Sequence, residues 1–223
     1  MRLAKLLTVI GGLGIVVFLI GMMTIPVLGQ EHIRLSEPRL YPLAESDWDE
    51  TQAKLLTPLK QYFKDGKVIN IFTTLARHPK LFHSWMPFGT HVLQTSTIPP
   101  REREILILRI GWLCQSEYEF GQHTLIGKQA GLSDEEILRI TKGSNAKGWD
   151  AFDTALIQAT DELHKDAFIS DKTWRTLSCR YNEKQILDLI FTVGEYSLVS
   201  MALNSCGIQR DPGVPGFPEG ADN

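Results

Sequence analysis

Residues 99–133 read PPREREILILRIGWLCQSEYEFGQHTLIGKQAGLS, and this stretch decides the fold. The two prolines suit the start of a helix. After the charged residues 101–104, the residues from Ile105 to Leu113 are almost wholly apolar and predict a helix buried on most sides. A second helix is expected from about Ser116 to Ala130, with Gly131 as its C-terminal cap. The stretch therefore predicts two adjacent helices at the centre of an all-α protein.

Three polar side chains fall on one face of the second helix. Ser116, Glu119 and His123 are separated by three and four positions, which places them side by side. A carboxylate beside an imidazole raises the pKa of the imidazole and fixes its orientation. Glu104, near the start of the first helix, reaches the same pocket if the two helices form a hairpin or corner. The pattern predicts an acid–base site, although a solvated Glu–His pair and an acid favouring a helix N-terminus explain the same residues.

Other residues of these helices have more than one interpretation. Arg109, a charge in an apolar helix, is expected to pair with a nearby carboxylate or, alternatively, to anchor an anion. Tyr118 and Trp112 are expected in the core or in the wall of the pocket. His83 and His91 have no carboxylate or cysteine at metal-ligand spacing, so they are expected to be packed or surface histidines. We predict no metal site.

The composition is that of a folded globular protein. Of the 223 residues, 43% are hydrophobic and 22% are charged. The 23 basic and 26 acidic residues give a net charge of −3, and no clustered basic face suggests a nucleic-acid partner. No β-alternation is visible in the body of the chain. We expect about eight helices in a domain over 46–207, after an extended linker at 30–45 and before a Gly/Pro-rich tail at 208–223.

The first thirty residues form a separate hydrophobic segment. No charged side chain occurs between Lys5 and Glu31, a length that suits a helix crossing a hydrocarbon core of about 30 Å. Arg2 and Lys5 precede this run, so the helical domain is expected on the non-cytoplasmic side of a membrane. Residues 1–29 are therefore expected to be an uncleaved signal anchor, with the membrane contact at 6–29, or a cleaved signal peptide of a secreted protein.

Three segments carry a resemblance to a known family. HPKLFHSW at 78–85, REREILILRI at 101–110 and YEFGQHTLIGKQAGLSDEEI at 118–137 occur in this order. Together they resemble the carboxymuconolactone decarboxylase family, which includes the alkylhydroperoxidase D-like proteins. The resemblance implies an alkylhydroperoxidase D-like helical bundle that forms homotrimers or hexamers. It also implies an enzyme that uses no cofactor.

The peroxidase branch of this family carries a glutamate, a C-x-x-C pair and a histidine. By spacing, the glutamate matches Glu104 and the histidine matches His123, whereas the two cysteine positions hold Ser116 and Glu119. Cys114 is offset by two positions and is expected to face elsewhere on the helix. Without this dithiol the chain resembles the decarboxylase-like branch more closely.

The resemblance implies lyase- or isomerase-like proton chemistry on a small lactone or keto-acid-like substrate. His123 is then the general base or acid, Glu119 orients it, and Glu104 is a second proton carrier. Ser116 and Arg109 are expected to hold a substrate carboxylate or enolate. The alternatives are a peroxide-detoxifying oxidoreductase with a single thiol, and a membrane-tethered oligomeric binding protein without chemistry.

Overall fold

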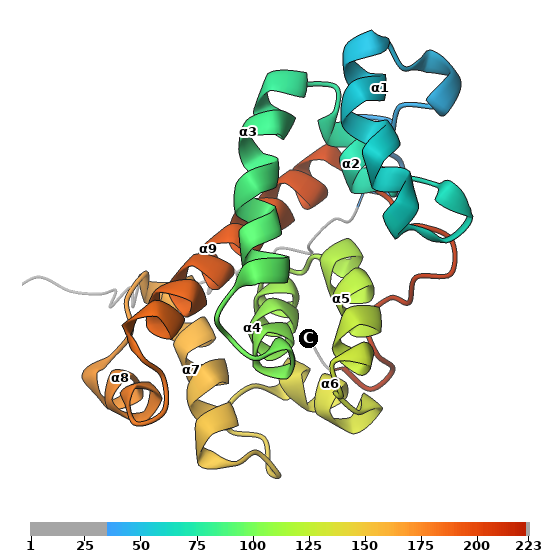
Figure 1. Ribbon diagram of the computed structural model, residues 1–223. Coiled ribbons are helices and arrows are strands. Elements are labelled where there is room, and N and C mark those ends of the chain that lie inside the picture. Colours follow the sequence, from blue (N-terminus) through green and yellow to red (C-terminus); the bar gives the residue numbers. More distant parts are fainter. Residues whose placement is uncertain (1–34, 222–223) are drawn as a thin grey trace, which may run out of the picture. The chain divides into compact units, whose positions relative to one another are not determined.

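The computed structural model describes residues 35–221, which all fall within one compact unit of the chain (Figure 1). Within these residues the structure contains α-helices, short helical turns and no strand, as predicted. The hydrophobic segment at 6–29 lies outside the described residues. The α-helices are α1 (Glu50–Leu56), α2 (Asn70–Leu75), α3 (Pro79–Thr90), α4 (Pro100–Leu113), α5 (Glu117–Gln129), α6 (Asp134–Lys142), α7 (Ala151–Asp166), α8 (Asp171–Ser178) and α9 (Glu183–Cys206).

Helix α4 is the central element of the fold. It contacts α5, α6, α7 and α9, and every residue from Glu102 to Trp112 is buried. The apolar residues from Ile105 onward explain most of this burial. The buried charges of Glu102, Arg103, Glu104 and Arg109 are tolerated because each has an ion-pair partner. Since α4 begins at Pro100, the acid in its first turn is Glu102, and Glu104 lies two residues further along, in the second turn. The interpretation of Glu104 as an N-terminal acid is therefore wrong.

Side-chain caps define several helix starts. Ser133 and Asn182 form capping boxes with the third residue of α6 and of α9. At the start of α1 the capping box belongs to Asp49, and a short 3₁₀ turn occupies Glu45–Asp47, so Ser46 does not cap this helix. Ser46 instead donates a hydrogen bond to the side chain of Asp47.

Helix α9 is the longest helix of the described residues. By length and composition it is the one described helix that could cross a membrane, but half of its most apolar window is buried inside the protein. It contacts α4, α5, α7 and α8. These contacts are those of a core helix, so α9 covers the central pair α4 and α5.

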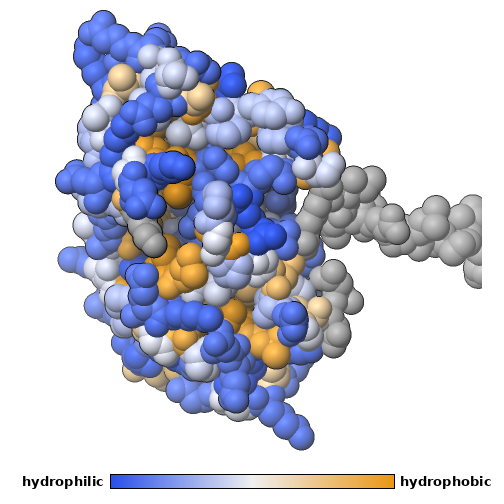
Figure 2. Space-filling model, turned by 90° about the vertical axis from the view of Figure 1, so that its right-hand side faces the viewer, coloured by the Kyte–Doolittle hydropathy of each residue, from blue (hydrophilic) through white to orange (hydrophobic). Residues whose placement is uncertain are grey.

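The segment after α9 folds back onto the helices instead of extending away. The Phe217 ring lies 4.9 Å from that of Trp112 and 5.2 Å from that of Phe120. Asp211 accepts a hydrogen bond of 2.6 Å from the Tyr118 hydroxyl. Figure 1 shows this red segment beside α5. On the face in Figure 2, apolar patches alternate with hydrophilic side chains.

We predict that Gly121 is required for the packing of this segment on α5. A Cβ at Gly121 would collide with the Pro215 carbonyl oxygen and lie 2.8 Å from Val214 Cγ1. Gly121→Ala should therefore lower the free energy of unfolding by about 1–3 kcal/mol, measured by urea denaturation. The matched control is Gly194→Ala in α9, where a Cβ meets nothing within 4 Å and should stabilise the helix. Equal stabilisation by both alanines would contradict the packing described here.

Candidate functional site

The site forms where α4 and α5 meet. His123 Nδ1 lies 2.6 Å from Glu104 Oε2, and His123 Nε2 lies 3.0 Å from Glu119 Oε1. One imidazole is thus held at both ring nitrogens by carboxylates from two different helices. The structure thus brings Glu104, Glu119 and His123 together, as expected if the two helices form a hairpin.

A tight turn between the helices sets this geometry. Gln115 has a positive φ of 52°, and the Ser116 amide donates a 2.8 Å hydrogen bond to the Gly111 carbonyl. The left-handed residue reverses the chain at once, as at many helix C-termini. Helix α5 then runs back along α4, which places residue 123 beside residue 104.

A second cation completes the cluster. Arg103 Nε donates a 2.9 Å hydrogen bond to Glu104 Oε1, so each oxygen of Glu104 has a charged partner. Glu104 has no exposed surface, while Glu119 is 3% and His123 is 5% exposed. Buried charges need paired partners. Arg103 and His123 provide two positive charges for the carboxylates of Glu104 and Glu119.

The two carboxylates decide the protonation of the imidazole. Burial lowers the pKa of His123, but the charges and hydrogen bonds of Glu104 and Glu119 outweigh it and raise the pKa to about 10. His123 is therefore an imidazolium at neutral pH. It donates hydrogen bonds to both glutamates, which makes it an acid at that pH.

Helix α9 adds two residues that the sequence did not single out. The Tyr196 ring packs edge-on against the His123 ring, with 4.8 Å between centroids. Glu195 is buried and accepts a hydrogen bond from Trp85 Nε1. Burial and the charge of Glu119 raise the pKa of Glu195, against the effect of the Trp85 bond. In the sequence, the signal that could have identified Glu195 is a glutamate within an otherwise apolar stretch of α9.

Ser116 lies next to this cluster. Its backbone is the N-cap of α5, but its side chain accepts no capping hydrogen bond. The hydroxyl is fully buried and has no hydrogen-bond partner. Ser116 lies three residues before Glu119, about one turn along the same helix face.

Arg109 contacts other parts of the fold. Its Nε lies 2.6 Å from Asp161 Oδ1, and its Nη1 donates to the carbonyls of Ile140 and Thr141 at 2.9 and 3.0 Å. The ion-pair interpretation of Arg109 therefore describes the structure. Its contacts join α4 to α6 and α7 and are those of a structural ion pair, not of an anion anchor.

Tyr118 and Trp112 are both buried against the segment after α9. The Tyr118 hydroxyl donates to Asp211 and accepts a 3.2 Å hydrogen bond from the Ile71 amide. Trp112 packs on Phe217. Their recorded contacts are those of core residues, which is one of the two interpretations that the sequence left open.

The cysteines form no disulfide: Cys114, Cys179 and Cys206 are all free. Cys114 is half-buried at the end of α4, and its sulfur lies 3.9 Å from His164 Nδ1. Burial raises the pKa of the Cys114 thiol, and the charge of Glu119 raises it further, while Ser200 lowers it. The thiolate, which is the nucleophilic form, is therefore disfavoured.

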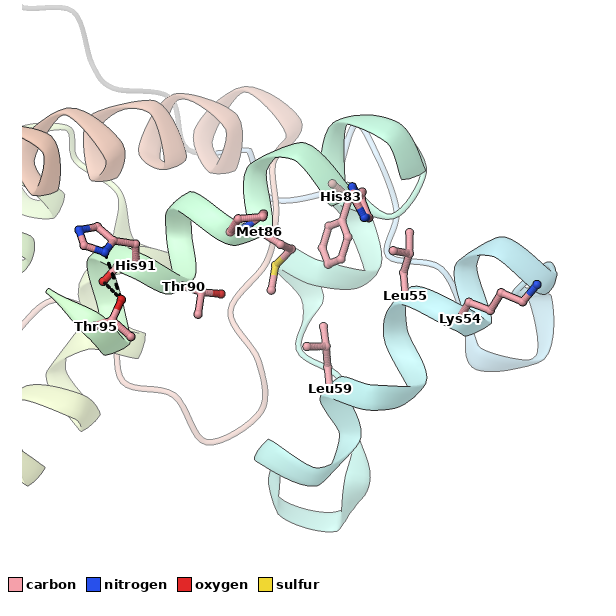
Figure 3. A pocket seen from close by; sticks show the side chains of 10 residues that line it. Lys54, Leu55, Leu59, His83, Met86, Thr90, His91 and Thr95 are labelled. Carbon is pink, nitrogen blue, oxygen red and sulfur yellow. Dashed lines mark hydrogen bonds between the residues drawn. The ribbon is translucent and has the colours of Figure 1, made fainter.

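A groove of about 440 Å³ lies apart from this cluster, between α1 and α3 (Figure 3). Leu55, Leu59 and Met86 line it, together with His83 and His91. His91 also contacts Asp188 at 3.0 Å. A second hollow of about 380 Å³ lies between α5, α6 and the segment after α9. Neither is lined by the three residues of the acid–base cluster.

Comparisons agree with the helical core described above. Residues 79–161 match the family model of the carboxymuconolactone decarboxylase family. No curated protein matches the sequence. The sequence resemblance and the alkylhydroperoxidase D-like fold are thereby confirmed.

Solved structures share the fold at low sequence identity. An uncharacterized peroxidase-related protein from Ralstonia eutropha, described as an alkylhydroperoxidase AhpD core, has a TM-score of 0.67 at 15% identity, over 78% of this chain and 92% of its own. A peroxidase-related protein from a Silicibacter species has a TM-score of 0.66 at 17% identity, covering 88% and 100%. The debrominase Bmp8 with 2,3,4-tribromopyrrole has a TM-score of 0.64 at 12% identity, covering 79% and 94%.

We predict that His123 keeps both ring protons well above neutral pH. In ¹⁵N NMR its ring nitrogens should show the imidazolium signature at pH 8 and lose it as the pH rises through about 10. In urea the same histidine should titrate near ~6.5. Because the folded pKa exceeds the unfolded one, this contribution to stability is complete below ~6.5 and decreases as pH rises towards 10.

Proton release gives an independent measurement. Unfolding at pH 8 should release about one more proton from the wild type than from His123→Gln. A neutral imidazole in the folded protein at pH 7 would contradict the charge arrangement described here.

Proposed function

From residues 79–161, which match the carboxymuconolactone decarboxylase family on an alkylhydroperoxidase D-like fold, we propose that this protein is an acid–base enzyme. It would catalyse decarboxylation or isomerisation of a small lactone or keto-acid-like substrate without a cofactor. One observation carries the proposal: a buried histidine bridges two glutamates, with Nδ1 on Glu104 and Nε2 on Glu119.

The geometry supports a division of roles. Glu104 is the most deeply buried member and also pairs with Arg103, so it fixes the orientation of His123. Glu119 is then the base that takes a proton from a carbon next to a carbonyl. His123 acts as the acid that returns a proton to the product. The sequence led us to expect that Glu119 orients His123 and that Glu104 is a second proton carrier. In this proposal the two glutamates exchange roles: Glu119 is the base, and Glu104 positions His123.

The energetic basis is the environment of the cluster. Proton transfer by a positioned group contributes about 10²- to 10⁴-fold to a rate. Moving the proton from carbon to Glu119 carries negative charge from the carboxylate to the substrate oxygen, so the net charge of the buried site stays constant. A site shielded from water favours such a transfer, because no new charge has to be solvated.

The alternative of a peroxide-detoxifying oxidoreductase with a single thiol has less support. The two positions at which the resemblance places cysteines hold Ser116 and Glu119. Cys114, the nearest thiol, has a raised pKa. The names of the peroxidase-related neighbours describe those proteins, which share only the fold with this one. The debrominase bound to a pyrrole supports the idea that this fold can accept a small ring compound.

Assembly and location belong to the same proposal. The resemblance supports a homotrimer or hexamer, and the hydrophobic sequence at 6–29 supports a membrane anchor or signal peptide. The enzyme would then act on the non-cytoplasmic side of the membrane.

The proposal predicts exchange of a substrate proton with solvent. Small unsaturated lactones and β-keto acids are incubated with the protein in D₂O, and deuterium at the carbon beside the carbonyl is followed by NMR. We expect incorporation by the wild type and a loss of about 10²- to 10⁴-fold in Glu119→Gln and His123→Gln. The control is His91→Gln, which removes an exposed histidine that also contacts a carboxylate, Asp188.

Two results would overturn this assignment. One is exchange that is retained in Glu119→Gln and His123→Gln. The other is hydrogen peroxide consumption that is abolished by Cys114→Ser, because the proposed chemistry needs no thiol.

A further inference from the structure

Two serine hydroxyls are buried without partners near the acid–base cluster. Ser116 and Ser200 have no exposed surface, and neither Oγ has a hydrogen-bond partner of normal geometry. Most buried polar groups in proteins are paired, since an unpaired one costs the desolvation of that group. Other serines of this chain do find a partner: Ser197, one turn earlier on α9, donates a 2.8 Å hydrogen bond to the Val193 carbonyl.

The register between α5 and α9 places both hydroxyls on the same side of Glu119. Tyr196 faces His123, with 4.8 Å between the ring centroids. Further along α9, Asn204 Nδ2 donates a 2.9 Å hydrogen bond to the Cys114 carbonyl, two residues before Ser116. Residue numbers therefore rise along α9 as they fall along the facing side of α5, so the two helices run in opposite directions here.

Ser200 falls between these two contacts. It is four residues after Tyr196 and thus one turn along the same face. Counted back from His123, Glu119 lies one turn earlier in α5. Ser116, the N-cap of α5, lies about one turn before Glu119. The Ser200 hydroxyl also lies beside the Cys114 thiol and lowers its pKa, without forming a hydrogen bond of normal geometry. The charge of Glu119 raises the pKa of the same Cys114 thiol, so Glu119 also lies near Cys114.

We propose that Ser116 and Ser200 form a pair of hydroxyl donors that binds the carbonyl oxygen of an uncharged substrate beside Glu119. This inference rests on the proposed function and narrows it: the substrate is a neutral lactone or ketone, and the reaction is isomerisation, because decarboxylation needs a carboxyl group on the substrate. Glu119 removes the proton from the carbon next to the carbonyl. The C–H electron pair forms the C=C bond of an enolate, and the two O–H groups stabilise the resulting oxyanion.

The charges of the cluster explain why the substrate is neutral. The two recorded cations, Arg103 and His123, already pair with Glu104 and Glu119. A carboxylate beside Ser116 would meet Glu119 without a free counter-charge, and like charges disfavour each other in a buried site. A neutral carbonyl avoids this repulsion. It becomes negative only when Glu119 becomes neutral.

The test uses matched probes. Neutral γ-lactones and cyclic ketones, beginning with γ-butyrolactone, are compared with their carboxylated derivatives by NMR titration of the full chain. We expect the neutral member of at least one pair to bind at least tenfold more tightly. Ser116→Ala and Ser200→Ala should each weaken that binding by about 3- to 10-fold. The control is Ser197→Ala, whose hydroxyl is already bonded to its own helix.

Thermal unfolding without a probe separates binding from folding. Because the two hydroxyls are unpaired, Ser200→Ala and Ser116→Ala should leave Tm unchanged or raise it. A large fall in Tm for both would show that they are structural and would overturn the inference. So would tighter binding of the carboxylated probes, no binding of any neutral probe, or neutral binding that ignores both alanine variants.

The outcomes also separate this inference from the proposed function. Deuterium incorporation that depends on Glu119 but not on either serine overturns the hydroxyl pair and leaves the acid–base enzyme. Serine-dependent binding of neutral probes without any deuterium incorporation overturns the enzyme and leaves the binding site.

Discussion

The structure depends on keeping a charged imidazole inside a protein core. His123 is protonated because Glu104 and Glu119 hold both of its nitrogens, and Arg103 pairs with the other oxygen of Glu104. Removing one member of a buried ion pair typically costs about 3–5 kcal/mol, because its partner is left uncompensated. The cluster therefore constrains both the packing of α4 against α5 and the protonation state available for chemistry.

Local sequence predicted the part of this arrangement that lies within one hairpin. Apolar residues along α4 imply its burial, and helical spacing puts Glu119 beside His123. Glu104 reaches them because the turn at Gln115 is immediate. These relations involve residues at most nineteen positions apart, so periodicity and turn chemistry are sufficient to suggest them.

Contacts between distant segments could not be predicted in this way. Tyr196 and Ser200 reach the site through the register of α9, which an apolar helix with several equivalent faces does not determine. The choice between an ion pair and an anion anchor for Arg109 depended on Asp161, fifty-two residues away. The Gly/Pro composition after α9 indicated the end of a helix but not the docking of Phe217 on Trp112.

The contrast with a dithiol site illustrates how a fold is separate from its chemistry. A carboxylate at position 119 stabilises the imidazolium and also disfavours ionisation of the neighbouring Cys114 thiol. The same charge thus keeps the proton on the imidazole and opposes formation of a thiolate. A thiol pair at positions 116 and 119 would remove both the base and one of the unpaired hydroxyls. Two side chains on an unchanged backbone are therefore sufficient to determine which kind of reaction this helical core can support.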